Sequence, residues 1–161
     1  MMPEMPASVT RAIWLLRVVV VWAGLTALLT WVFSDQLIRA WAAGNETARV
    51  ILDERGLEGL KESSINIPAF APVAIVLFVV FAAMAGVLVV FFRAGHGWAR
   101  MAMTLMVVFM GFSTVAGLRR DPPGFFIALS VIGLLLSLSL LVLLWHRDTS
   151  RYLKAPYVRS A

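Results

Sequence analysis

Four long apolar runs constrain this chain more than any other feature of its sequence. They are bounded by charges, prolines or glycines and cover residues 12–33, 69–92, 101–118 and 124–145. About 20 consecutive apolar residues are enough for an α-helix to cross the hydrocarbon core of a bilayer. Backbone groups in hydrocarbon must form hydrogen bonds within their own segment, so each run is expected to be helical. The sequence therefore predicts an all-α membrane protein, a four-transmembrane-helix bundle.

The composition agrees with a single membrane domain over residues 1–161. The chain is 61% hydrophobic and only 14% charged, which is far more apolar than a soluble domain. The first run exceeds the roughly 7–15 apolar residues of a signal peptide and has no suitable cleavage site after it, so we predict that it is a span. The run at 101–118 is the shortest, and we expect its helix to include Trp98 and Ala99.

Basic residues in the flanking segments predict the orientation. With the N-terminus inside, eight of the 14 Lys and Arg residues are cytoplasmic, and four of the other six are spread through the long segment at 34–68. Because cytoplasmic flanks are enriched in Lys and Arg, both termini, including a tail at 146–161, are predicted to lie in the cytoplasm of a cell-membrane protein. The Arg119-Arg120 pair opposes this orientation, and Asp121 offsets it only in part.

The segment at 34–68 is the only long polar stretch, and it is predicted to be an external loop that is partly helical. Ser34 is expected to cap a first helical piece that ends at Gly44. Asn45 is expected to cap a second piece that ends at Gly56.

Apolar side chains form a partial stripe along these two pieces. Such a stripe is typical of a loop that folds over its own bundle or lies along the membrane surface. The more specific alternative is a docking surface for a protein. The segment has six acidic and four basic residues, and this net negative charge disfavours binding to anionic lipid. The candidate docking residues are Leu37, Trp41, Ile51 and Leu52.

Catalytic and metal-binding patterns are missing from the sequence. The chain has no cysteine, and its two histidines, His96 and His146, form no ligand pair. Serines within the apolar runs lack a His or Lys base on any run, and all nine acidic residues lie outside the runs. We therefore expect no metal, no cofactor and no enzymatic activity, and the lack of a buried carboxylate also disfavours proton-coupled transport.

Small residues four positions apart occur in three of the four runs. Such pairs let transmembrane helices approach closely, either within a bundle or against a partner helix. They are Ala82 and Gly86, Ser113 and Gly117, and Gly133 and Ser137.

The turn at residues 93–100 is the most distinctive local pattern. Two glycines favour a tight reversal, and two arginines flank it at the level of the cytoplasmic headgroups. Its simplest interpretation is a helical hairpin held at the membrane surface. A specific lipid site is the alternative, with Arg93, Trp98 and Arg100 as candidate headgroup contacts.

This turn ends in Trp98-Ala99-Arg100, and the last run leads into the sequence Leu144-Trp145-His146-Arg147-Asp148-Thr149-Ser150-Arg151-Tyr152. Together these two elements resemble a broad group of small, uncharacterised four-span membrane proteins of actinobacteria. That group carries a Gly-x-x-Trp-Ala-Arg turn and a terminal Trp-Arg-x-x-Ser-x-x-Tyr pattern, from which this tail differs by one residue in spacing. The resemblance implies a bacterial cytoplasmic membrane and a four-span fold, and it implies no activity.

Three functional hypotheses follow. The leading one is a non-catalytic accessory or structural subunit that acts through lateral helix contacts and its external loop in a larger membrane assembly. A small transporter or oligomeric channel is the alternative, and a lipid-modifying enzyme using Asp53, Glu54 and Asp121 is the third. The expected partners are membrane lipids and another membrane protein or a second copy of this chain. The net charge of +5 is attributed to headgroup contacts, so nucleic acid is not expected.

Overall fold

The computed structural model describes residues 5–120 and 122–154, and within them it contains seven helices and no strand. Four of the helices are long and apolar enough to cross a membrane, which confirms the predicted all-α, four-span class. They begin and end within five residues of the predicted runs. These helices are α1 (Ala7–Val32), α4 (Phe70–Arg93), α5 (Gly97–Leu118) and α6 (Gly124–Leu144).

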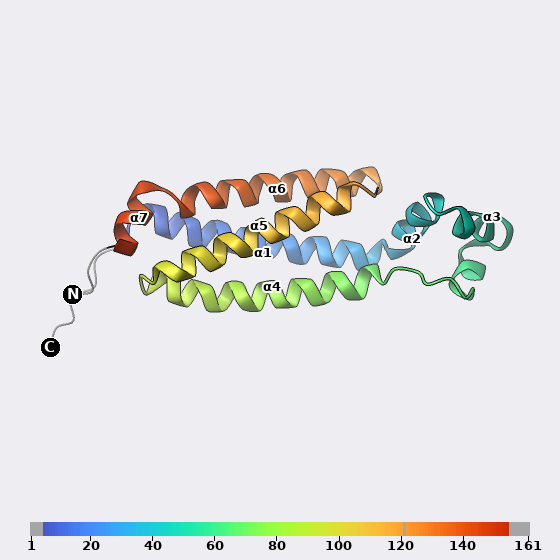
Figure 1. Cartoon of the computed structure of the whole chain (residues 1–161), viewed down its shortest axis with the longest axis horizontal. Helices are drawn as coiled ribbons and strands as arrows, with labels where there is room; N and C mark the ends of the chain where they lie inside the picture. Colours follow the sequence, from blue (N-terminus) through green and yellow to red (C-terminus); the bar gives the residue numbers. More distant parts are fainter. Residues whose placement is uncertain (1–4, 121, 155–161) are drawn as a thin grey trace.

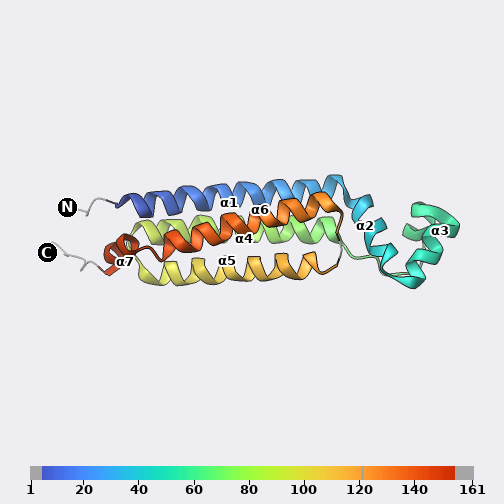
Figure 2. The ribbon, with the colours of Figure 1, turned by 90° about the horizontal axis from the view of Figure 1, so that it is seen from above.

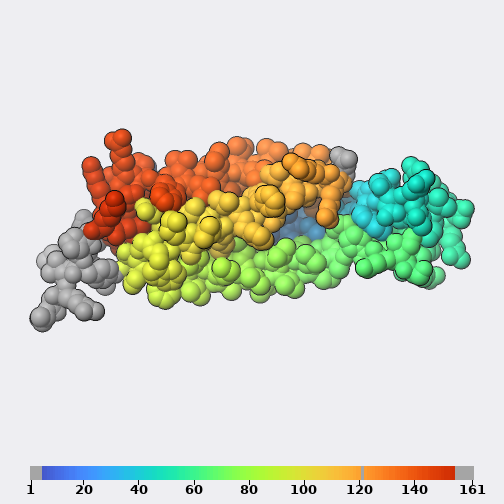
Figure 3. Space-filling model, viewed as in Figure 1, coloured from blue at the N-terminus to red at the C-terminus, as the bar shows by residue number. Residues whose placement is uncertain are grey.

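The four long helices form an elongated bundle (Figures 1 and 2). Helices α4 and α6 each pack against both α1 and α5, so α1 and α5 lie diagonally opposite each other. A short helix, α7 (Arg147–Lys154), lies at the same end of the bundle as the first turn of α1, and we refer to this end as the terminal end. Helices α2 (Ser34–Ala43) and α3 (Glu46–Lys61) form a cap that extends the bundle at the opposite end (Figure 3).

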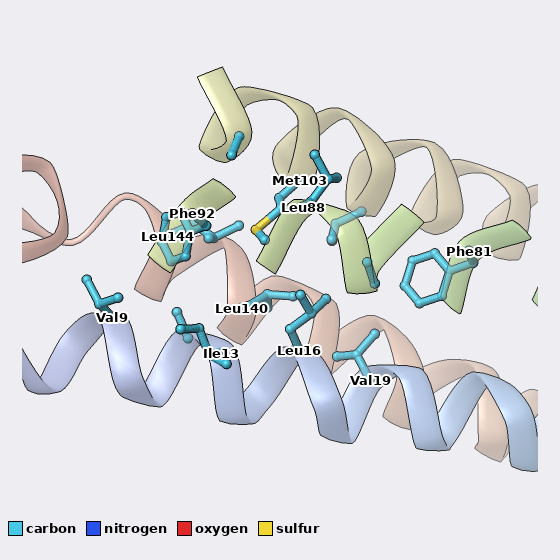
Figure 4. Close-up of a cluster of buried hydrophobic side chains, with 14 residues drawn as sticks. Val9, Ile13, Leu16, Val19, Phe81, Leu88, Phe92, Met103, Leu140 and Leu144 are labelled. Atoms are coloured by element: carbon cyan, nitrogen blue, oxygen red, sulfur yellow. The ribbon is translucent and has the colours of Figure 1, made fainter. Parts of the chain in front are cut away.

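The main core fills the terminal half of the bundle (Figure 4). In α1, Val9, Ile13 and Leu16 recur at spacings of three and four and therefore share one helix face. They meet fully or nearly fully buried side chains of α4, α5 and α6. Among these partners are Phe81, Leu88, Phe92, Met103, Val107, Leu140 and Leu144.

The turn between α4 and α5 is the tight reversal that the sequence predicted. Gly95 has φ 81, a left-handed backbone conformation that glycine adopts without a steric penalty. Helix α5 begins at Gly97 and so includes Trp98, whose ring packs on Phe91 with centroids 4.9 Å apart.

The cap has a small core of its own, centred on the fully buried side chains Ala42, Ala48 and Leu60. The predicted cap at Asn45 is confirmed, because its side-chain oxygen accepts a hydrogen bond of 3.1 Å from the Ala48 amide. The helical backbone stops at Gly56 (φ 71, ψ −172), as predicted, and α3 is two helical pieces that meet at a kink there.

The predicted cap at Ser34 is wrong. The chain turns from α1 into α2 over a single residue, Phe33, so Ser34 is already the first residue of α2 and makes no capping hydrogen bond. The Phe33 amide still donates to the Leu29 carbonyl, which keeps the backbone bonded through the turn. Helices α1 and α2 are therefore nearly continuous.

Candidate functional site

A cavity of 1260 Å³ lies in the cap half of the bundle. All four long helices contribute to its wall, and α2 of the cap contributes Leu37 and Trp41. In the space-filling view, α1 is visible in blue at the bottom of an opening between α5 and α4 (Figure 3). The side chains of Val80 and Phe109, which line the cavity from α4 and α5, are 50% and 68% exposed. The cavity therefore opens sideways, between α4 and α5.

Two aromatic side chains hold the closed side of this cavity. The Trp22 indole Nε1 donates a hydrogen bond of 3.1 Å to the Leu129 carbonyl and so joins α1 to α6. Gly133 makes room for this indole, and Gly24 makes room for the Phe78 ring from α4. Helix α1 thus stays close to α6 and α4, while α5 is left to diverge from α4 toward the cap (Figure 1).

The cavity wall is mostly apolar, although three threonines, Asn45, Ser113 and Ser130 also line it. The hydroxyls of Thr26, Thr30 and Thr114 donate to carbonyl oxygens four residues earlier on their own helices, at 2.9, 2.8 and 2.9 Å. They are therefore already satisfied. Phenylalanine and methionine side chains supply much of the remaining surface: Phe70, Phe78, Phe81, Met84, Met106, Phe109, Met110 and Phe126.

Among the residues that the structure describes, Arg119 and Arg120 are the only charged side chains that line the cavity. They follow the C-terminus of α5, are exposed, and form no ion pair with any residue in the described part of the chain. Asp121, which the sequence places beside them, lies outside the described residues. The cavity thus combines an apolar interior with two cationic side chains at its cap end, where α5 ends. We call this end the mouth of the cavity, to distinguish it from the side opening between α4 and α5.

At the terminal end, α7 is held by a network of polar contacts that we call the clamp. The Thr149 hydroxyl is fully buried and is hydrogen-bonded, at 3.0 Å each, to the Ser8 hydroxyl and the Leu143 carbonyl. The Tyr152 hydroxyl donates to the Arg93 carbonyl at 2.7 Å. The clamp therefore ties α7 to the first turn of α1 and to the end of α4.

Arg100 is the central side chain of this network. Its guanidinium donates to the Ser150 hydroxyl at 2.9 Å and lies 4.3 Å from the centre of the Trp145 ring, a cation–π contact. The Trp145 indole in turn donates to the Thr104 hydroxyl at 3.1 Å.

The three predicted headgroup contacts therefore differ in their surroundings. The Arg100 guanidinium is engaged within the protein, and its buried Nε has no partner among the described residues. Arg93 and Trp98 are exposed at the same end of the bundle. In the structure, the turn that ends at Arg100 meets the segment at 144–152, a pairing that their separation along the chain does not reveal.

The four candidate docking residues are half-buried. Trp41, Ile51 and Leu52 pack against the core of the cap, and Leu37 lines the cavity. Lys61 at the end of α3 joins the two helices of the cap, because its ammonium lies 3.0 Å from Asp35 on α2 and 3.3 Å from Glu58 on α3. Hydrogen bonds to Asp35 and then Glu58 raise the pKa of Lys61 above its usual value.

Titratable groups elsewhere do not converge. The described residues contain no group of three His, Cys, Asp or Glu side chains that could hold a metal ion. The His146 imidazole lies 3.5 Å from Asp148 on the surface of the terminal end. Asp53 and Glu54 are exposed on α3 and do not line the cavity.

Comparison with protein-family models, curated proteins and solved structures gives no match to this chain. Its class follows from its four long apolar helices, which define a multi-pass, all-α membrane protein. The resemblance to the actinobacterial group stays a prediction. The sequence did not predict the cavity, and the signal that could have indicated it was the basic pair Arg119-Arg120, which does not fit the orientation predicted from the other basic residues.

Proposed function

We propose that this protein is a non-catalytic accessory or structural subunit of a larger membrane assembly. The observation that carries the proposal is the position of one small-residue pair. Of the three pairs, Gly133 and Ser137 are used inside the bundle, and Ser113 and Gly117 line the cavity. Gly86 on α4 lies outside the cavity wall, is exposed and has nothing within 4 Å of the place where a Cβ would lie. An exposed glycine on a transmembrane helix leaves a shallow groove in which a partner helix can approach closely.

The cap supports the same proposal. It is a folded unit with its own core, and residues 34–68 carry six acidic against four basic side chains. Because Trp41, Ile51 and Leu52 are used inside the cap, we assign the docking face to the exposed side of α3 around Val50, which is 49% exposed. A folded, charged and partly apolar surface is suited to a protein partner.

A small transporter or channel is the second candidate, and the cavity is the observation that favours it. Against it, the apolar core of Leu16, Met103 and Leu140 fills the bundle between the cavity and the terminal end. The threonine hydroxyls of the cavity wall are already bonded to their own helices. The accessory role therefore remains the better supported proposal, and no observation favours the lipid-modifying enzyme.

The test of the accessory role is the replacement of Gly86 by leucine. We expect the tagged wild-type chain, purified from its native membrane in mild detergent, to bring one stoichiometric membrane partner with it. The Gly86→Leu variant should fold normally yet lose most of that partner, because the leucine fills the groove. Val87→Leu is the matched control, since Val87 is 57% exposed next to Gly86 and already carries a side chain.

Two outcomes would contradict the accessory role. One is a homogeneous homo-oligomer that carries solute across the membrane of reconstituted vesicles. The other is a partner that Gly86→Leu retains as fully as Val87→Leu does.

We also propose that both chain termini, and with them the terminal end of the bundle, face the cytoplasm and that the cap faces the outside of the cell. A protease added to intact cells is expected to leave a tag after Ala161 uncut and to cut a protease site inserted next to Gly44, which is exposed at the end of α2. Permeabilised cells, in which both sites should be cut, provide the control. Cleavage of the tag at Ala161 in intact cells would show that the proposed orientation is wrong.

A further inference from the structure

We propose that the cavity binds one anionic membrane lipid, with its acyl chains among the apolar side chains and its phosphate group at Arg119 and Arg120. This inference concerns a different surface from the α4 groove and does not depend on the accessory role. It also gives a function to the basic pair that opposed the predicted orientation.

The interior of the cavity favours hydrocarbon chains. Its volume of 1260 Å³ exceeds the roughly 300–1,000 Å³ of most small-ligand pockets. Phe and Met side chains form much of its wall, and the hydroxyls of Thr26, Thr30 and Thr114 are already bonded to backbone. Methionine side chains are unbranched and adaptable, so Met84, Met106 and Met110 can adjust to a chain that has no fixed shape.

The mouth of the cavity favours an anionic headgroup. Two guanidinium groups stand together there, no carboxylate of the described residues lines the cavity, and neither arginine forms an ion pair within the described chain. Arginine binds phosphate oxygens through paired, charge-assisted hydrogen bonds. Arg119 and Arg120 follow the last turn of α5, a span that ends at Leu118, which places them at headgroup depth.

The side opening favours a lipid over a water-soluble anion. Leu77, Val80 and Phe109 line it with 56%, 50% and 68% of their surfaces exposed, and they belong to spanning helices. A molecule that passes between α4 and α5 therefore comes from the bilayer itself. The occupant that satisfies the apolar wall, the cationic mouth and the lateral opening together is a phospholipid with a net negative charge.

The proposal can be tested on the purified chain alone. The protein is stripped of lipid, mixed with phosphatidylglycerol and phosphatidylcholine of identical acyl chains, and examined by native mass spectrometry. We expect one tightly retained phosphatidylglycerol per chain. The double variant Arg119→Gln/Arg120→Gln should retain it about tenfold less or weaker still, because it loses the charge-assisted hydrogen bonds.

Three further variants define the site. Arg147→Gln/Arg151→Gln removes the same charge from the exposed terminal end and should leave retention unchanged. Ser113→Trp places a large ring in the cavity and should also reduce retention, whereas Ser139→Trp, on an exposed part of α6 outside the cavity wall, should not.

Equal retention of the two lipids by the wild type would overturn the proposal, as would unchanged retention by both Arg119→Gln/Arg120→Gln and Ser113→Trp. Glycerol phosphate serves as the water-soluble competitor. If it displaced phosphatidylglycerol at equal concentration, the site would bind a soluble anion and the lipid assignment would be wrong.

Discussion

Replacing Gly133 by leucine is expected to lower the free energy of unfolding by about 2–4 kcal/mol. A Cβ at this position would lie 3.3 Å from Nε1 and 3.4 Å from Cδ1 of Trp22, which is already a tight contact. The further carbons of leucine have no room unless the indole moves. The indole would then lose its hydrogen bond to the Leu129 carbonyl, leaving a polar N–H in an apolar wall.

Thermal unfolding in detergent, followed by circular dichroism, measures this effect. Gly133→Ala should cost much less, because its single methyl group requires the indole to shift only slightly. Gly86→Leu is the matched control, since nothing lies within 4 Å of a Cβ there. If Gly133→Leu unfolded at the same temperature as Gly86→Leu, the contact between α1 and α6 at Trp22 would not be a close one.

The second large effect is expected at Leu140, a fully buried side chain of the main core. Truncating a buried leucine to alanine costs about 2–5 kcal/mol in soluble proteins, from lost transfer energy and from the cavity that remains. The unfolded helix in detergent or lipid keeps an apolar environment, so the transfer contribution is small here. The lost packing contacts remain, and we expect a cost near the lower limit, about 2 kcal/mol.

Leu138 provides the comparison on the same helix, because its side chain is 60% exposed. Leu138→Ala should change the unfolding midpoint in a sodium dodecyl sulfate titration by little, and Leu140→Ala should lower it clearly. Equal effects of the two substitutions would mean that the terminal half of the bundle is not packed as described.

The sequence was sufficient to predict the four spans, because run length and apolarity determine which segments cross a membrane. It could not predict which face of each span points inward. The spans are apolar all round, since lipid and the protein core favour the same side chains, so Leu138 and Leu140 look equivalent until the helices are packed.

Features that depend on a few neighbouring residues, such as a helix cap, were predictable from the sequence. Features that depend on how the helices pack or connect were less predictable. The Asn45 cap needs only three residues of chain and was predicted correctly. The Ser34 cap was wrong, because α1 and α2 are joined by one residue and leave no separate helix start. The cavity required the divergence of α5 from α4, which depends on contacts such as Trp22 with Leu129 across more than 100 residues of chain.

The clamp has a consequence for how the protein is made. Ser8 lies in α1, which is synthesised before α6 and α7, and its partner Thr149 lies 141 residues later in the chain. Helices emerge in chain order, so the first span has to wait in the bilayer until α6 and α7 have been synthesised. During that interval its inward face, including Val9 and Ile13, lacks the α6 and α7 contacts that help to bury it in the folded bundle. The bundle is therefore completed by its last two helices, and a chain that ends before Thr149 cannot form the clamp.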